Sequence, residues 1–89
     1  MDILKRAVAG TMESSDAYVE IEPNESGSVR VTLESVVAKQ FGSRIKASVE
    51  EVLNEQGVKS ASVRVIDRGA LDCVIRARVE TAILRAKED

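Results

Sequence analysis

The sequence predicts an α+β fold in which helix covers a small, mostly antiparallel sheet. Residues 17–22 and 29–34 alternate apolar and polar side chains with a period of two, as half-buried strands do. Residues 35–57 instead carry apolar side chains at spacings of three and four, the period of an amphipathic helix. The chain has 89 residues, 44% of them hydrophobic and 31% charged, which supports one domain with a thin core.

The first two strands are predicted to pair as an antiparallel hairpin. Their sequences are AYVEIE at residues 17–22 and VRVTLE at residues 29–34, and the turn-forming stretch PNESGS joins them. The connection is longer than the two-residue turn of the tightest hairpins. The inward-facing residues are Ala17, Val19 and Ile21 in the first strand and Val29, Val31 and Leu33 in the second.

The long helix is predicted between two recognisable end signals. Ser35 is suited to be its N-cap, and Gly57 is suited to be the left-handed residue beyond its C-terminus. Gly42, inside the pattern, costs about 1 kcal/mol relative to alanine. The predicted apolar face consists of Val37, Phe41, Ile45, Val49, Val52 and Leu53.

The last third contains a predicted third strand followed by an ambiguous segment. In VKSASVRVIDRG, Ala61, Val63 and Val65 share one face. Residues 70–89 fit two patterns. As a strand they place Leu71, Cys73, Ile75, Ala77 and Val79 on one face; as a helix they form a stripe of Leu71, Val74, Ile75, Val79, Ala82, Ile83 and Ala86. Because DRGALD looks like a hairpin loop, we predict a fourth strand to about Val79, with Arg76 and Arg78 facing outward, and then a short C-terminal helix.

Composition excludes several classes of function. The net charge of −2 disfavours a nucleic-acid binder, which normally has a basic excess. No apolar run approaches the roughly 20 residues that cross a bilayer, and the start MDILKRAVAG is not typical of a signal peptide. A single cysteine fits a reducing compartment, so we expect a cytoplasmic protein without membrane partners.

The chain is poorly equipped for catalysis. It has no histidine and one cysteine, which excludes a histidine-based catalytic site and a nitrogen/sulfur zinc site. Cys73 is interpreted as a small core residue. The carboxylate pairs Glu20/Glu22 and Glu50/Glu51 are interpreted as solubilising charges. We therefore predict no catalytic residue and no metal site.

Charge is unevenly distributed along the chain. Between Ala7 and Ser28 every charged residue is acidic, namely Glu13, Asp16, Glu20, Glu22 and Glu25. The arginines of the last third are Arg64, Arg68, Arg76, Arg78 and Arg85. Such runs are usually solvated faces. The alternative is that the basic side receives an anionic group or an acidic partner.

Two adjacent serines stand out near the start, in the stretch AVAGTMESSD. Ser14 and Ser15 lie between Glu13 and Asp16 in a segment, residues 1–15, that we predict to be flexible. A serine without a base is not a catalytic nucleophile. An exposed and mobile hydroxyl can nevertheless accept a group transferred by another enzyme, although composition alone favours a plain polar entry to the first strand.

Three motifs together resemble the acyl carrier protein (gamma) subunit of citrate lyase. They are AVAGTMESSD, VAKQFG and RGALDCVIRARVETA, in the expected order, and the resemblance extends from about Ala7 to Ala86. The pattern GT-x-ES-x-D alone would be weak, but the combination is specific. The DSL motif of fatty-acid carriers is absent, and the predicted strands argue against their all-helical fold.

The resemblance implies a covalent prosthetic group on Ser14, the serine directly after Glu13. In that family the group is 2'-(5''-phosphoribosyl)-3'-dephospho-CoA, joined through a phosphodiester. Ser15 occupies a position that varies in the family and can be glycine. Residues 1–89 would thus be a single acyl carrier domain, with the attachment serine in the flexible segment 1–15.

The resemblance also implies how the chain would act. The arm's thiol holds acetyl and citryl thioesters while citrate is cleaved to acetate and oxaloacetate. The alpha subunit exchanges the acyl groups, the beta subunit cleaves the citryl group, and a holo-carrier synthase attaches the arm. Tethering makes each transfer effectively intramolecular. The acidic stretch around Ser14 is expected to guide encounter with these partners, or Arg76 and Arg78 to approach the arm's phosphates.

Alternatives remain at two levels. Within the same class, the chain could be the carrier of citramalate lyase or of malonate decarboxylase, because the partner subunits decide the substrate. Outside it, the chain could be a small non-catalytic α+β interaction module with no covalent group.

Overall fold

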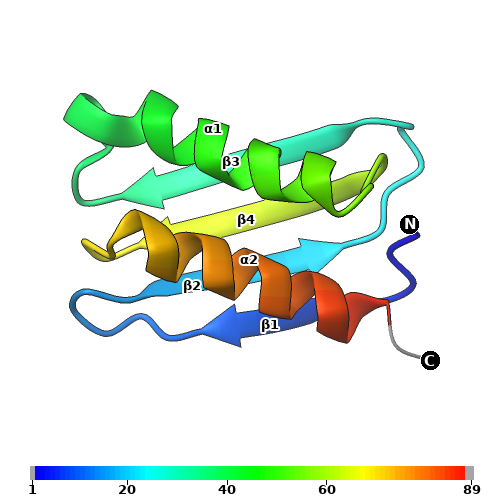
Figure 1. The fold of residues 1–89 in the computed structure, drawn as a ribbon, viewed down its shortest axis with the longest axis horizontal. Coiled ribbons are helices and arrows are strands. Elements are labelled where there is room, and N and C mark those ends of the chain that lie inside the picture. The colour runs from blue at the N-terminus through cyan, green and yellow to red at the C-terminus, as the bar shows by residue number, and fades with distance from the viewer. Residues whose placement is uncertain (1, 88–89) are drawn as a thin grey trace.

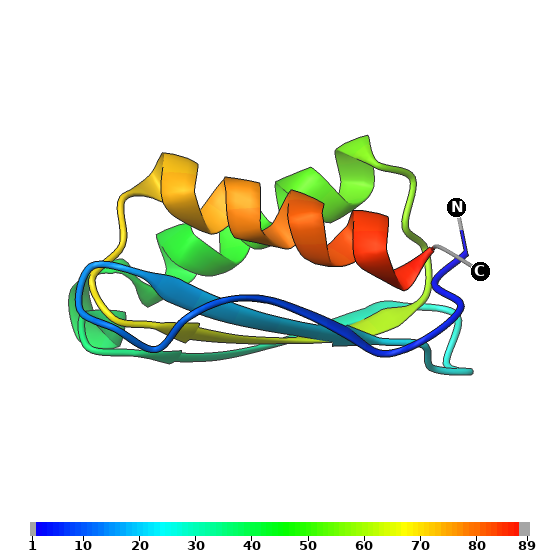
Figure 2. The same cartoon turned by 90° about the horizontal axis from the view of Figure 1, so that it is seen from below.

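One four-stranded sheet carries both helices on the same face, and none of residues 2–87 forms a helix or strand over its other face (Figures 1 and 2). The computed structural model describes residues 2–87. In chain order the elements are β1 (Ala7–Gly10), β2 (Ala17–Glu22), β3 (Val29–Ser35), α1 (Ala38–Glu55), β4 (Ala61–Asp67) and α2 (Asp72–Ala86). The predicted α+β class is confirmed.

The sheet is mixed, with the strand order β1-β2-β4-β3. β2 is antiparallel to both β1 and β4, whereas β4 is parallel to β3. The predicted hairpin of residues 17–22 with residues 29–34 is wrong, because β4 lies between these two strands. Alternation identified β2, β3 and β4 but not their partners. The helix α1 is the long crossover that a parallel pair such as β3 and β4 requires.

The first strand, β1, was not predicted. It lies at an edge of the sheet inside the segment expected to be flexible, and it pairs with β2 from Ala7 opposite Ile21 to Gly10 opposite Tyr18. A four-residue strand is too short to show a period of two. The true hairpin is therefore β1–β2, and residues 11–16 are its loop. Met1 and residues 88–89 lie outside the described residues.

The predicted strand across residues 71–79 is also wrong, because α2 begins at Asp72. The helix packs against β1, β2 and α1. Its buried residues are Ile75, Val79, Ala82, Ile83 and Ala86, most of the helical stripe in the sequence. Leu71 is 72% exposed and Cys73 is exposed, so neither belongs to the core. The periodicity fitted both structures, and tertiary packing decided between them.

The core lies between the helices and the sheet. The inward residues predicted for β2 and β4 are buried, and so are Ile45, Val49, Val52 and Leu53 of α1. Phe41, predicted on the same face, is 45% exposed. Ser35 does not occupy the N-cap position of α1, which is Val37. The Ser35 hydroxyl accepts a hydrogen bond from the Val37 N–H and donates one to the Asp67 carboxylate. Gly57 has the predicted left-handed conformation, with φ of 73°.

Three connections meet at one end of the molecule, opposite the end where the chain starts and finishes (Figure 1). They are the β1–β2 loop, the link from β3 to α1 and the link from β4 to α2. This end therefore gathers residues that are far apart in sequence. Within residues 2–87, neither helix is long and apolar enough to span a membrane.

Candidate functional site

The β1–β2 loop begins with an unusually close approach of two backbone segments. Gly10 has φ of 89°, and a Cβ atom there would lie 1.9 Å from the carbonyl oxygen of Ala17. Only glycine can occupy this position without moving the backbone. Later in the loop, Ser15 has φ of 66°, also in the left-handed region.

Backbone hydrogen bonds fasten the loop to the β4–α2 link. The Ser15 N–H donates to the carbonyl of Arg68 at 2.8 Å, and the Arg68 N–H donates to the carbonyl of Asp16 at 2.9 Å. Inside the loop, the Asp16 N–H donates to the carbonyl of Glu13 at 3.1 Å. The three bonds hold the backbone on both sides of Ser14.

The carboxylate of Asp16 is the centre of the loop's side-chain bonding. Its Oδ1 accepts from the Ala17 N–H at 2.7 Å and from Arg78 Nε at 3.0 Å. Its Oδ2 accepts from the Thr11 hydroxyl at 2.7 Å and from Arg78 Nη2 at 3.0 Å. The side chain is only 16% exposed. Arg78, followed by Thr11, lowers the pKa of Asp16 from 3.8 to about 2.

The exposed hydroxyls of Ser14 and Ser15 take no part in this bonding. The Ser14 hydroxyl makes no hydrogen bond with any of residues 2–87, and the residue lies in the turn at the tip of the loop. Ser15 is exposed as well, but its backbone is tied to Arg68. The expected exposure of both serines is confirmed. The loop as a whole is anchored at several points; the predicted flexibility of residues 1–15 stays a prediction.

Arg76 and Arg78 point to different regions of the molecule. Two residues apart, they would share a face on the predicted strand, but they lie on different sides of a helix. Arg78 reaches Asp16, 62 residues earlier in the chain. Arg76 binds Asp72 of its own helix and Glu51 of α1. The sequence signal for the Asp16–Arg78 pair was the acidic stretch of residues 7–28 and the arginines of the last third. This signal does not show which acidic residue pairs with which arginine.

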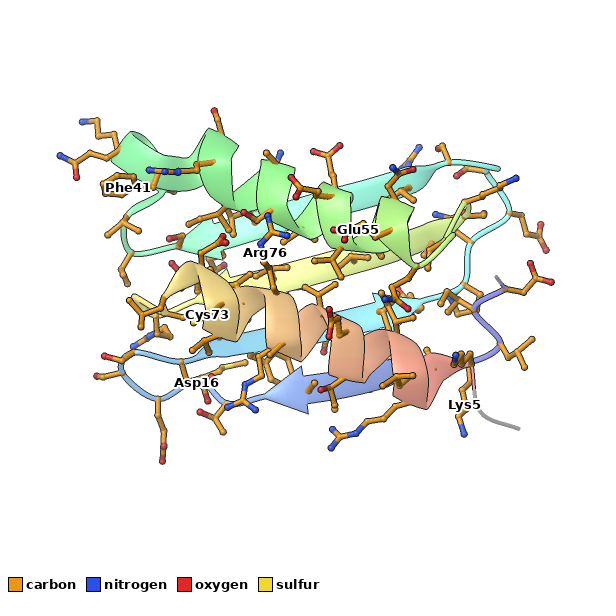
Figure 3. All side chains as sticks on the ribbon, in the orientation of Figure 1. Lys5, Asp16, Phe41, Glu55, Cys73 and Arg76 are labelled. Atoms are coloured by element: carbon orange, nitrogen blue, oxygen red, sulfur yellow. The ribbon has the colours of Figure 1, made fainter. Side chains whose placement is uncertain are left out.

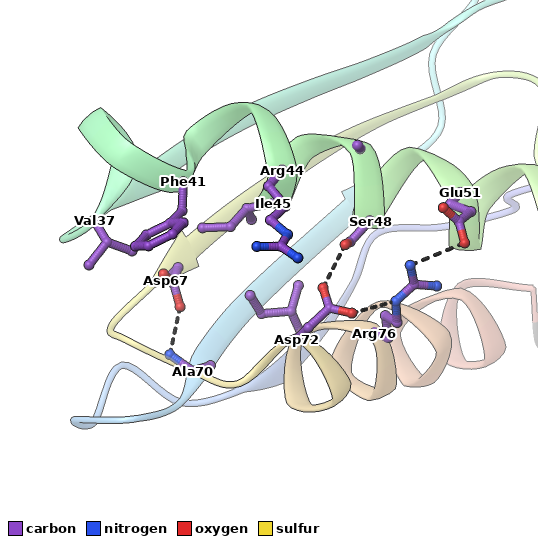
Figure 4. A pocket seen from close by; sticks show the side chains of 12 residues that line it. Val37, Phe41, Arg44, Ile45, Ser48, Glu51, Asp67, Ala70, Asp72 and Arg76 are labelled. Atoms are coloured by element: carbon purple, nitrogen blue, oxygen red, sulfur yellow. Dashed lines mark hydrogen bonds and ion pairs between the residues drawn. The ribbon is translucent and has the colours of Figure 1, made fainter.

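A groove between α1 and α2 opens at the same end as the loop (Figure 4). Its volume is about 500 Å³, and Arg76 lies along one side. Figure 3 shows Phe41, Cys73 and Asp16 at this end of the molecule. The apolar lining residues are Val37, Phe41, Ile45, Ala47, Ala70 and Ile75. Sequence reasoning did not find this groove, because it assigned residues 71–79 to a strand.

Comparison with known proteins identifies the family. Residues 4–86 match the family model for an acyl carrier protein described as malonate decarboxylase delta subunit (MdcD). The chain is 52% identical over 89 residues to the citrate lyase acyl carrier protein of Haemophilus influenzae, covering all of this chain and 92% of the relative. The chain belongs to the citrate lyase acyl carrier protein family.

Two further relatives agree with membership of this family. The Streptococcus mutans protein named citrate lyase acyl carrier protein is 51% identical over 99% of this chain and 86% of its own length. Citrate lyase acyl carrier protein 2 of Salmonella paratyphi A is 50% identical, with coverages of 99% and 91%. Membership makes the chain a non-catalytic carrier.

A solved structure shares the fold. A chain in the crystal structure of a Pseudomonas malonate decarboxylase hetero-tetramer in complex with malonate superposes with a TM-score of 0.83. The alignment covers 97% of this chain and 88% of the other, at 24% sequence identity. The mixed sheet with two helices on one face is thus a fold that the solved protein also adopts.

Proposed function

We propose that this chain is the acyl carrier subunit of citrate lyase and that Ser14 carries its covalent arm, 2'-(5''-phosphoribosyl)-3'-dephospho-CoA. The observation that carries the proposal is the contrast within one loop. Asp16 is bound by Arg78, Thr11 and the backbone, while the Ser14 hydroxyl at the tip has no partner among residues 2–87. An acceptor needs an accessible oxygen on a defined support, and this loop provides both.

The residues around Ser14 fit a phosphodiester-linked group. Two carboxylates lie near the acceptor, those of Glu13 and Asp16, and Arg78 neutralises the second through a bidentate ion pair. An added phosphate therefore meets less repulsion than the sequence stretch suggests. When attached, the arm supplies a thiol that holds acyl groups as thioesters.

The backbone conformation of Ser15 supports Ser14 as the attachment residue. The Ser15 φ of 66° lies in the left-handed region, which favours glycine. The resemblance implied that glycine can occupy this position in the family, and the geometry gives a physical reason. A backbone role for position 15 supports Ser14 as the acceptor.

The division of labour follows from the site. The loop contributes the acceptor oxygen and a fixed orientation. The alpha subunit of the lyase exchanges the acyl groups, and the beta subunit cleaves the citryl group. A holo-carrier synthase attaches the arm. Mounting the arm at the molecule's end lets it enter a partner's active site while the sheet and helices stay outside. We place this complex in the cytoplasm.

A second candidate is the carrier of malonate decarboxylase, which the name of the matching family model favours. Citrate lyase is preferred because relatives bearing that name are 50–52% identical over nearly the whole chain, against 24% for the malonate decarboxylase chain. The carrier of citramalate lyase would use the same loop in the same way, since the partner subunits select the acid.

The experiment is to co-express the chain with the synthase and a source of its nucleotide precursor and to measure intact mass. Wild type and Ser15→Ala are expected to gain one adduct of the mass of the arm, and Ser14→Ala none. Circular dichroism of Ser14→Ala checks that the fold is retained. An adduct on Ser14→Ala, or none on wild type with an active synthase, would overturn the proposal.

A further inference from the structure

The groove between α1 and α2 lies beside the proposed attachment loop and has no role in that proposal. We propose that it is a docking site for the thiol-bearing end of the chain's own arm and its acyl group. This inference rests on the proposed function. The ligand class is a flexible, largely uncharged chain of amide and methylene groups that ends in a thioester.

The size and lining of the groove suit such a ligand. Its volume of about 500 Å³ is within the usual range of small-molecule sites, and ligand sites are mostly apolar with a few placed polar groups. The ring of Phe41 and the side chain of Ile45 come from α1, while Ile75 comes from α2 and Ala70 from the link before it. Figure 4 shows the ring of Phe41 directed toward the groove.

The charged side chains around the groove are mostly paired. Ser48 and Arg76 both bind Asp72, and Arg76 also binds Glu51, which joins the two helices across the groove. The Ser48 hydroxyl, then Arg76, hold the pKa of Asp72 below its usual value, with a smaller pull from Arg44. The walls are thus fixed by their own bonds, without need of a ligand.

Arg44 differs from the other charged residues that line the groove. Its side chain makes no hydrogen bond or ion pair with residues 2–87, although its charge helps to lower the pKa of Asp72. Figure 4 shows its guanidinium at the groove. It can therefore bind a carboxylate of an acyl group. The three carboxylates of the lining, Glu51, Asp67 and Asp72, disfavour the arm's phosphates, so the uncharged end of the arm is the part that fits.

The attachment loop and the groove share a structural neighbour. The Ser15 N–H bonds to the carbonyl of Arg68, and Asp67 and Ala70, on either side of Arg68, line the groove. A tether on Ser14 thus starts beside the groove. Short flexible tethers give effective concentrations in the millimolar range, so a groove with a dissociation constant of about 1 mM for the free ligand would be about half occupied.

The test compares NMR spectra of the apo protein and of the protein loaded with the arm, with and without a carboxylated acyl group. Intact mass first confirms that the wild type carries one adduct and that Ser14→Ala carries none. Docking is expected to shift the backbone amides of Phe41, Ile45 and Ile75, far along the chain from the loop. Phe41→Ala is expected to reduce these shifts at least about twofold, because at half occupancy a weaker groove empties readily.

Matched charge reversals separate docking from general electrostatics. Arg44→Glu is expected to reduce the groove shifts most with the carboxylated acyl group. Lys46→Glu makes the same change in charge at an exposed site on α1 that does not line the groove, and it is expected to leave the shifts unchanged.

Three results would overturn the inference. If the adduct is present and only residues 11–16 shift, the arm stays in solvent and the proposed function survives alone. Groove shifts that arise only after adding the alpha or beta subunit would make the groove a subunit-docking surface instead. If Ser14 bears no adduct, the proposed function fails and the docking site fails with it.

Discussion

Arg78 and Arg76 lie two residues apart on α2 and stabilise two different regions, the attachment loop and the inter-helix groove. Arg78 gives both of its hydrogen bonds to one carboxylate, Asp16, which is 16% exposed. Arg76 distributes its bonds and ion pairs among three carboxylates that are 58–61% exposed, those of Glu51, Glu55 and Asp72. A bidentate pair with a shielded partner is worth more than several solvated ones. The loop therefore depends on a single arginine, whereas the groove does not.

The largest expected effect concerns Gly10, at the start of the loop. Gly10→Ala should lower the free energy of unfolding by at least about 2 kcal/mol, because the new Cβ meets the Ala17 carbonyl and φ is 89°. Urea unfolding measures this. Gly27→Ala is the matched control: its φ is 76°, but nothing lies within 4 Å of the new Cβ. Equal losses in the two variants would show that the close approach at Gly10 has no energetic weight.

The next largest effect is expected from removing Arg78, the arginine of α2 that binds the loop residue Asp16. Arg78→Met keeps most of the aliphatic stem and should lower the free energy of unfolding by about 1–2 kcal/mol. The reason is that the Asp16 carboxylate loses its charged partner while it stays shielded from solvent. Hydrogen exchange of the Ser15 amide should accelerate as the loop opens. Arg64→Met is the control: its contact with Glu20 is 3.5 Å long and exposed, so a loss under about 0.5 kcal/mol is expected. If the Ser15 amide exchanges at the wild-type rate in Arg78→Met, the ion pair does not hold the loop.

The pH dependence isolates Asp16. Its pKa is lowered in the folded protein, from 3.8 to about 2, so the unfolded chain binds the proton more tightly. The stabilisation is therefore complete above about pH 4, the ordinary pKa, and is lost as the pH falls through about 2. The difference in unfolding free energy between wild type and Asp16→Asn should shrink over that window. A difference that stays constant from pH 5 to pH 2 would mean that the folded protein does not favour the Asp16 carboxylate.

Of the two regions, the groove is expected to show the smaller effect. Arg76→Met should change the free energy of unfolding by less than about 1 kcal/mol, since its partners remain solvated when left alone. Attachment of the arm to Ser14 should proceed at the wild-type rate. A larger loss than that of Arg78→Met would reverse the ranking of the two regions.

How much the sequence could predict varied with the kind of interaction. The faces of residues 17–22 and 61–65, and the buried stripe of the long helix from Ile45 onward, followed from local periodicity alone. The pairing of strands did not, because it depends on where the crossover α1 places β4. Cys73 and Leu71 were misplaced for the same reason as α2, since two periods fitted one segment and only packing on β1 and β2 decided.

In the candidate site, too, local sequence predicted some features, and tertiary packing decided the others. Ser14 could be named from motif resemblance, and its exposure followed from the polar composition of its surroundings. The Asp16–Arg78 pair could not be predicted, since nothing local links residues 62 positions apart. The groove depends on two helices meeting, and one of them was assigned to a strand.

The most direct test of the central claim is mass-spectrometric sequencing of the serine-containing peptide from the carrier purified as the native complex. Trypsin cuts after Arg6 and Arg30 and releases Ser14 and Ser15 in one fragment, which also contains Ser26 and Ser28. Fragmentation that leaves the phosphate bond intact is expected to place the whole adduct on Ser14. Fragments that place it on Ser15, or a native peptide with the Ser14 and Ser15 hydroxyls unmodified, would contradict the account.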